Sequence, residues 1–130
     1  MSANLDLIRS TYEGTPDETR RALRAALAPD VEWTEAAGFP YAGTYFGPDA
    51  VFDGVFRRLA EEWIGYRADV HTYLADGVHV AAFGVYTGTY RATGKAMTAT
   101  FAHLYEIREG RIARMTQVVD SAIVNRALVA

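Results

Sequence analysis

Apolar positions in the first quarter of the chain recur at helical spacing. The pattern runs through residues 5–12, and Gly14 follows it as a stop. TPDE at 15–18 is typical of a capping box, in which a threonine and a glutamate three residues later pair with free backbone amides. Its apolar stripe covers residues 22–27 and ends before Pro29. Two short helices are therefore predicted at the start of the fold.

The middle of the chain changes pattern twice. Residues 30–36 (DVEWTEA) alternate in a way that predicts a short strand with one mixed face. Residues 38–47 hold three glycines, a proline and four aromatic residues, which predicts a loop. Gly47-Pro48 then opens a third helix. Its apolar residues repeat at the helical period: Val51, Phe52, Val55, Phe56, Leu59 and Trp63.

The second half has the period of two that is typical of strands. Asp76-Gly77 and Glu109-Gly110 are tight hairpin signals, and a third link lies at 92–95. A short helix is predicted after the last strand, with Asp120 or Ser121 as its cap. The pattern therefore predicts a four-stranded antiparallel meander, with strands at 66–75, 78–90, 96–108 and 111–120.

Helices followed by long antiparallel strands indicate an α+β fold. We expect a curved, mostly antiparallel mixed sheet, with the three N-terminal helices packed on its concave face. Gly84 and Gly88 lie inside the second meander strand, where a missing side chain permits a bend. A bent sheet with helices across it forms a cone-shaped barrel, and a cone of this kind can hold a small molecule.

The length, charge and composition of the chain limit the partners that are expected for it. A chain of 130 residues fits one domain spanning 1–130. The net charge is −3 and the basic residues are dispersed, so nucleic acid is not an expected partner. Cysteine is absent, and the chain shows neither a signal-peptide pattern nor 18 consecutive apolar residues. These features predict a cytoplasmic protein that does not bind membranes.

Two stretches resemble a known family. FAHLYEIREGRI and QVVDSA, together with the Trp-containing first strand and the Gly-Pro helix start, resemble the nuclear transport factor 2-like superfamily. Within it, the chain is most similar to the SnoaL-like polyketide cyclase and ketosteroid isomerase-related branch. The matching positions are His103, Gly110, Gln117, Asp120 and the Thr93-Gly94-Lys95 link.

The resemblance implies a function but does not fix it, because this fold serves many activities. It implies a cofactor-independent isomerase, cyclase or lyase that acts on a small apolar or aromatic carbonyl compound, with Asp120 or His103 as general base. It also implies a homodimer formed through the open sheet face. Two alternatives remain: a non-catalytic module that binds an apolar ligand or dimerises, and an epoxide hydrolase with Glu35 and Asp120 as its carboxylates.

Side-chain alternation places His103 on the face shared by Phe101 and Tyr105. On an apolar face, the imidazole would stay neutral and could accept a proton, or it could simply bond to a backbone carbonyl. Whether Gln117 joins this face depends on the hairpin turn. A two-residue loop pairs residue 103 with 116 and sends Gln117 away, whereas a three-residue loop with a bulge brings Gln117 alongside, and the family pattern favours the second.

Each candidate carboxylate has two interpretations. Asp120 is either the cap of the last helix or a base at the pocket mouth, and the two roles are compatible. Glu35 is either a second acid on the Trp33 side of its strand or a solvated carboxylate at the sheet edge. The residues predicted to bind a substrate are Tyr12, Trp33, Glu35, Tyr45, Phe46, Trp63, Phe101, Tyr105 and Gln117. His71 and His79 fall on opposite strand faces, so no metal site is expected.

Overall fold

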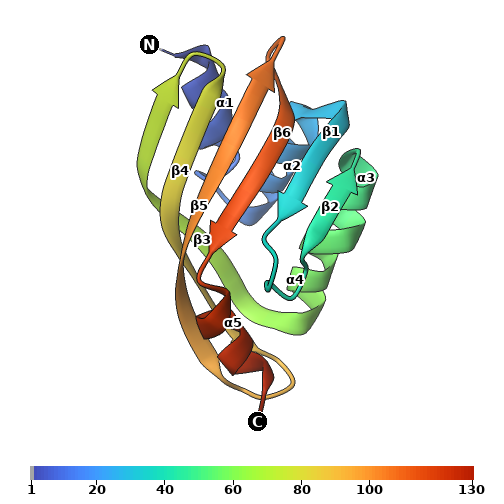
Figure 1. Cartoon of the computed structure of the whole chain (residues 1–130), viewed down its shortest axis with the longest axis vertical. Helices are drawn as coiled ribbons and strands as arrows, with labels where there is room; N and C mark the ends of the chain where they lie inside the picture. The colour runs from blue at the N-terminus through green and yellow to red at the C-terminus, as the bar shows by residue number, and fades with distance from the viewer. Residues whose placement is uncertain (1) are drawn as a thin grey trace.

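The computed structural model describes residues 2–130 and contains one six-stranded sheet (Figure 1). The strand order is β2-β1-β6-β5-β4-β3, with β1 parallel to β6 and every other pair antiparallel. The predicted mixed, mostly antiparallel sheet is therefore confirmed, although β2 and β3 remain open edges and the barrel does not close. The strands are β1 (Leu27–Glu35), β2 (Gly43–Phe46), β3 (Trp63–Asp76), β4 (His79–Tyr90), β5 (Ala96–Arg108) and β6 (Arg111–Val119).

The helices of the first half cover one face of this sheet (Figure 1). They are α1 (Ala3–Ser10), α2 (Pro16–Ala26), α3 (Pro48–Val51), the π-helical turn η1 (Phe52–Phe56) and α4 (Arg57–Glu62). The capping box at Thr15 and Glu18 is present in full. After β6, α5 (Ser121–Leu128) closes one end of the sheet and packs against β5 and β4.

The structure corrects three boundaries. Residues 38–47 are not all loop, because 43–46 form the edge strand β2 and pair with β1. Trp63 begins β3 instead of ending the third helix, since its backbone turns extended and it pairs with Tyr90. The first hairpin turns one residue later than predicted, with Asp76 opposite His79.

Curvature in the sheet comes from the pairing of β3 with β4. The register shifts at His71, which forms a bulge between Val70 and Thr72. Opposite this bulge lies Gly84, where an added Cβ would sit 2.1 Å from the backbone oxygen of Asp69. Only glycine permits this close approach of β4 to β3 beside the bulge.

The two faces of the sheet differ in character. Along β5 and β6, buried and exposed residues alternate, and the buried set faces the helices. We call this side the inner face and the opposite, solvated side the outer face. Three polar side chains are buried on the inner face among aromatic and aliphatic ones: Glu35, His103 and Gln117.

Candidate functional site

The three buried polar residues come from neighbouring strands β1, β6 and β5. His103 on β5 lies directly opposite Gln117 on β6. On the other side of β6, Thr34 pairs with Thr116, which places Glu35 next to Gln117. Glu35, Gln117 and His103 therefore form one row across three strands, in agreement with the expectation that Gln117 shares the face of His103.

The register that aligns this row arises differently from both predicted alternatives. Glu109 and Gly110 both have positive φ (52° and 74°), the geometry of a two-residue type I′ turn, so Arg108 pairs with Arg111. A bulge then follows, because Ile107 pairs with Ile112 whereas Glu106 pairs with Arg114. The extra residue moves Gln117 opposite His103 and back to the inner face.

His103 is held by tyrosine hydroxyls at both ring nitrogens. The Tyr86 hydroxyl lies 2.5 Å from Nε2, and the Tyr12 hydroxyl contacts Nδ1. The Tyr12 oxygen also lies 2.5 Å from that of Tyr105. On the other side, Gln117 Nε2 donates to the Tyr86 oxygen at 2.8 Å. His103 thus bonds to side chains instead of a backbone carbonyl, at the centre of a connected polar cluster.

Burial decides the charge of this cluster. Desolvation lowers the pKa of His103 to about 3, so its imidazole is neutral at pH 7. The pKa values of Tyr12 and Tyr86 are raised well above the usual value, chiefly by burial, so both hydroxyls keep their protons. The cluster can therefore donate hydrogen bonds without carrying charge.

Glu35 is 5% exposed, so the solvated edge carboxylate considered from the sequence is excluded. The Trp33 indole N–H donates to its Oε2 at 3.1 Å. Burial raises the pKa of Glu35 to about 7, and the Trp33 hydrogen bond opposes part of that rise. A carboxyl group with this pKa exchanges its proton readily near neutrality.

Asp120 has the geometry of a helix cap. Its Oδ1 accepts the Ile123 backbone N–H at 3.2 Å at the start of α5, while its own N–H bonds to the Thr100 carbonyl. One carboxylate oxygen is thus engaged in capping, as one of the two sequence interpretations stated.

The predicted substrate-binding residues do not all gather at His103. Phe101 stacks on Tyr86 at a ring distance of 4.2 Å, and Trp33 contacts Tyr105 at 6.2 Å, so both belong to the cluster. Trp63 donates instead to the Tyr41 hydroxyl, and Tyr45 bonds to the Tyr41 carbonyl. Phe46 is 65% exposed and pairs with Glu32 on the outer face, so it does not line the inner face.

Sequence reasoning missed two tyrosines of the inner face. Tyr86 joins His103 to Gln117. It lies four residues from Ala82, the partner of His103 on β4, so strand alternation puts it on the face of His103 once that pairing is known. Tyr66 packs against Tyr86 at a ring distance of 5.3 Å, and its buried hydroxyl has no hydrogen-bond partner within residues 2–130. An unpaired buried hydroxyl of this kind can bond to a ligand oxygen.

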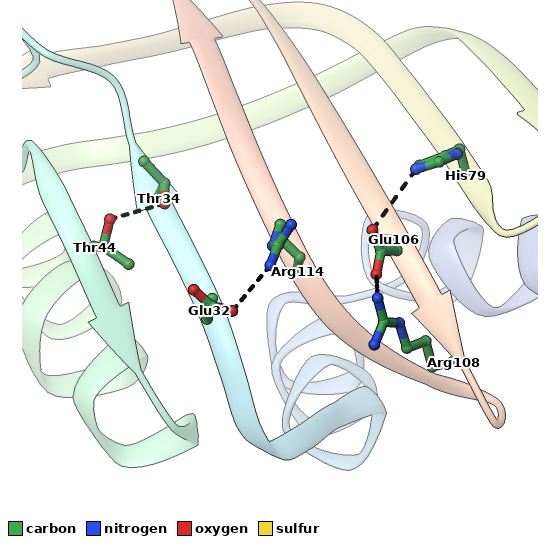
Figure 2. Close-up of polar contacts among 7 residues, drawn as sticks. All are labelled: Glu32, Thr34, Thr44, His79, Glu106, Arg108 and Arg114. Carbon is green, nitrogen blue, oxygen red and sulfur yellow. Dashed lines mark hydrogen bonds and ion pairs between the residues drawn. The ribbon is translucent and has the colours of Figure 1, made fainter.

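Two surface hollows lie away from the His103 cluster. One is lined by His79, Leu104, Glu106, Arg114 and Thr116, and Figure 2 shows three of these residues with their neighbours on the outer face. Glu35 and His103 are 5% and 7% exposed, so a molecule reaches them only if inner side chains move. Tyr12 lies in the turn after α1, and its hydroxyl contacts His103 Nδ1.

Two further features bear on partners. Within residues 2–130, no cluster of three acidic or histidine side chains is arranged to hold a metal ion. Over the same residues, no helix has the length and apolar composition needed to cross a membrane.

A curved open sheet with helices on its inner face and a buried polar cluster defines a nuclear transport factor 2-like protein. Similar solved structures agree. The chain is 37% identical to an NTF2-like protein from Burkholderia thailandensis over the full length of both chains, with a TM-score of 0.94. TerC, crystallised with polyporic acid, is 24% identical over 98% of both chains, with a TM-score of 0.86. A candidate SnoaL-like polyketide cyclase from Jannaschia sp. CCS1 is 18% identical over 98% of this chain and 92% of its own, with a TM-score of 0.80.

The family follows from the sequence match. The model of the SnoaL-like domain matches residues 8–115, so the chain belongs to the SnoaL-like domain family. This membership confirms the resemblance found in the sequence. A comparison with curated proteins found no match.

Proposed function

We propose that this protein binds a small, largely apolar carbonyl or aromatic molecule on the inner face of the sheet and moves a proton within it, without a cofactor. Glu35 acts as the base. The observation that carries the proposal is a buried carboxyl group one strand away from Gln117 and in the same row as His103. Family membership and the polyketide cyclase relative support a ligand-binding role of this kind.

Glu35 suits this role better than His103 or Asp120. Both nitrogens of His103 are already bonded, and a pKa of about 3 makes its imidazole a weak base. Asp120 uses one oxygen to cap α5. Glu35 accepts a single hydrogen bond within residues 2–130, from Trp33, which leaves its other oxygen free to take a proton. Its pKa of about 7 matches the operating pH of a general base.

The reaction is a proton transfer next to a carbonyl group. The Glu35 carboxylate removes a proton from the adjacent carbon, and the electron pair of the broken C–H bond moves to the carbonyl oxygen. A hydroxyl of the His103 cluster donates a hydrogen bond to the resulting enolate oxygen. Return of the proton from Glu35 to another carbon completes an isomerisation. Access requires the turn that carries Tyr12 to open.

A probe reaction tests the base without knowledge of the natural substrate. 5-Nitrobenzisoxazole is small, flat and apolar; a carboxylate removes its C3 proton, the N–O bond breaks, and a coloured nitrile phenolate forms. We expect the wild type to accelerate this elimination and Glu35→Gln to lower the rate by roughly 10²- to 10⁴-fold. Asp30→Asn, an exposed change on the same strand, is the matched control.

The pH profile and one further variant sharpen this test. Because the carboxylate is the active form, the wild-type rate should rise with pH through about 7 and then level off. Equal rates for the wild type and Glu35→Gln would contradict the proposal. A loss of rate confined to Asp120→Asn, which keeps a capping side chain, would place the base at Asp120 instead.

We also propose that two copies associate through the outer face. Leu104 and Val118 are 47% and 64% exposed on neighbouring strands β5 and β6. Beside them, Glu32 pairs with Arg114 at 3.1 Å and Glu106 with Arg108 at 2.6 Å (Figure 2). Since a two-fold interface brings a patch against itself, this balance of charges allows self-association where one sign alone would oppose it.

Sedimentation measures this association directly. The wild type should sediment at twice its 14.3 kDa mass at micromolar concentration, and Val118→Glu should sediment as a monomer because it buries a charge at the contact. Glu61→Gln, an exposed change on α4, is the control. A monomeric wild type would contradict the proposal.

A further inference from the structure

Five polar side chains and one backbone amide form an unbroken hydrogen-bonded line at the inner face. It runs from the Ala36 backbone N–H through Gln117, Tyr86, His103 and Tyr12 to Tyr105. Every residue between the two ends of the line bonds to two neighbours. The side chains of the line come from β4, β5, β6 and the turn after α1. Such a line has a direction, because every bond has one donor and one acceptor.

One end of the line fixes an orientation. The Ala36 N–H can only donate, and it lies 2.9 Å from Gln117 Oε1. The oxygen of the Gln117 amide therefore faces Ala36, and its NH₂ group faces Tyr86, 2.8 Å away. The Tyr86 oxygen must then accept a hydrogen from Gln117.

Two directions remain for the rest of the line. In the first, Tyr86 donates to His103 Nε2, His103 Nδ1–H donates to Tyr12, and Tyr12 donates to Tyr105. In the second, every one of these bonds is reversed, and His103 Nε2–H donates back to Tyr86. Both use a neutral imidazole, in keeping with the pKa of about 3 that burial gives His103.

The amide favours the first direction. There, all bonds from Ala36 to Tyr105 run head to tail, and each group that accepts a hydrogen bond becomes a better donor to the next. In the second direction, the N–H groups of Gln117 and His103 converge on the Tyr86 oxygen. The Tyr86 hydrogen is then left without an acceptor within residues 2–130, as the Tyr105 hydrogen is in the first direction, so the convergence of two donors on one oxygen is what separates the two directions.

We infer that Gln117 is a positioning residue that sets the direction of this line and so holds His103 as the Nδ1–H tautomer. The free donor is then the Tyr105 hydroxyl, whose ring packs against Trp33, the residue that binds Glu35. The functional part of this inference rests on the proposed proton transfer. In that reaction, the Tyr105 hydroxyl is the group that donates to a ligand oxygen beside the base Glu35.

Nitrogen-15 NMR of the histidine rings tests the inference on the free protein. The chain has three histidines, and His71 and His79 are exposed, so a His103→Asn variant assigns the buried ring. We expect wild-type His103 to show a protonated Nδ1 and an unprotonated Nε2 throughout pH 5–8. An Nε2–H tautomer in the wild type would overturn the inference with no variant needed.

The variant Gln117→Leu tests whether the Gln117 amide sets the tautomer of His103. Without its N–H donor the two directions become nearly equivalent, so the ring should change from one tautomer to a mixture with at least a tenfold larger Nε2–H population. Thr116→Leu, the neighbouring outer-face change on β6, should leave the tautomer unaltered. A pure Nδ1–H ring in Gln117→Leu, or an equal change in Thr116→Leu, would overturn the assigned role.

The NMR test of the His103 tautomer and the kinetic test of the Glu35 base can fail independently of each other. If Glu35→Gln leaves the elimination rate unaltered, the proposed base is wrong while the tautomer result still stands. If the rate depends on Glu35 but the ring is Nε2–H, the base is retained and only the direction of the line is wrong.

Discussion

Glu32 and Glu35 lie three positions apart on β1, on opposite faces of the sheet. Glu32 is partly exposed and pairs with Arg114, whereas Glu35 is buried and accepts one hydrogen bond from an indole. The residue type and the strand are the same, so the difference comes from the surroundings. Water and a cation stabilise the charge on the outer face, but on the inner face burial raises the pKa of Glu35 to about 7.

The same contrast extends along β5 and β6. On the outer face, polar groups make partly exposed ion pairs (Figure 2). On the inner face they make buried hydrogen bonds among aromatic rings. Buried hydrogen bonds are costly to break because the remaining partner stays desolvated, whereas exposed partners return to water. Reactivity and sensitivity to substitution should therefore both concentrate on the inner face.

The largest effect on stability is expected from a substitution of Met115 on β6, and the adjacent residue Thr116 provides the comparison. Met115 is fully buried and Thr116 is exposed. Met115→Ala should lower the free energy of unfolding by about 2 to 5 kcal/mol because it leaves a cavity, and Thr116→Ala should change it by less than about 0.5 kcal/mol. Urea unfolding of both variants provides the comparison. Similar losses would mean that the two faces are not packed differently.

The pH dependence of stability separates the two buried ionisable groups. Between pH 4.5 and 6.5 the unfolded chain protonates His103 while the folded chain does not, so this group makes stability rise with pH. Over the same range the folded chain keeps the proton of Glu35 while the unfolded chain loses it, so this group makes stability fall with pH. The two slopes oppose each other, and their sum should be nearly flat.

The substitution Glu35→Gln removes the contribution of Glu35 to the pH dependence of stability. The free energy of unfolding of this variant should rise by about 2 kcal/mol more than that of the wild type from pH 4.5 to 6.5, because His103 then acts alone. Thr34→Val, a change on the outer face of the same strand that removes no ionisable group, should keep the shape of the wild-type profile. Urea unfolding at several pH values measures this, and parallel profiles for the wild type and Glu35→Gln would show that Glu35 has no raised pKa.

The helices and strands show where prediction from the sequence succeeds. The capping box at Thr15, the helix after Pro48 and the strand at 96–108 were all predicted, because caps and periodicity are local signals. The family followed from the FAHLY and QVVD stretches, and the curved sheet from the helix-then-strand pattern with Gly84 and Gly88. His103 and Gln117 were placed on one face, though through a register that the sequence did not predict.

What the sequence left open depends on contacts between distant segments. The bulge that aligns Gln117 with His103 follows an ordinary two-residue turn, and nothing in the local residue pattern marks it. The burial of Glu35 depends on β1 lying beside β6, a parallel pairing of segments some 80 residues apart. Tyr86 was missed because a tyrosine in an alternating strand looks the same whether its hydroxyl faces a core or a histidine.

A smaller effect is expected from a single buried hydroxyl. Tyr86→Phe keeps the ring but leaves the Gln117 amide and His103 Nε2 without their shared partner. The free energy of unfolding should fall by about 1 to 3 kcal/mol. Thr34→Val, which removes the outer-face bond to Thr44, should cost less than about 0.5 kcal/mol in the same urea assay. A cost for Tyr86→Phe as small as that of Thr34→Val would show that the buried line does not stabilise the fold.

The smallest effect is expected from the Glu32–Arg114 ion pair, whose side chains are 43% and 52% exposed. In the Val118→Glu background, in which the outer face is free, a double-mutant cycle with Glu32→Gln and Arg114→Gln should give a coupling energy of about 0.2 to 1 kcal/mol, because water screens the pair. Raising the salt concentration from 0.1 to 1 M should reduce it further, since the screening length shortens from about 10 Å to about 3 Å. The matching cycle for Tyr86 and Gln117 on the inner face should be larger and nearly independent of salt. In the wild type, where the proposed association of two copies covers the outer face, the Glu32–Arg114 coupling should depend less on salt. A salt-insensitive coupling in Val118→Glu would show that water does not screen this pair.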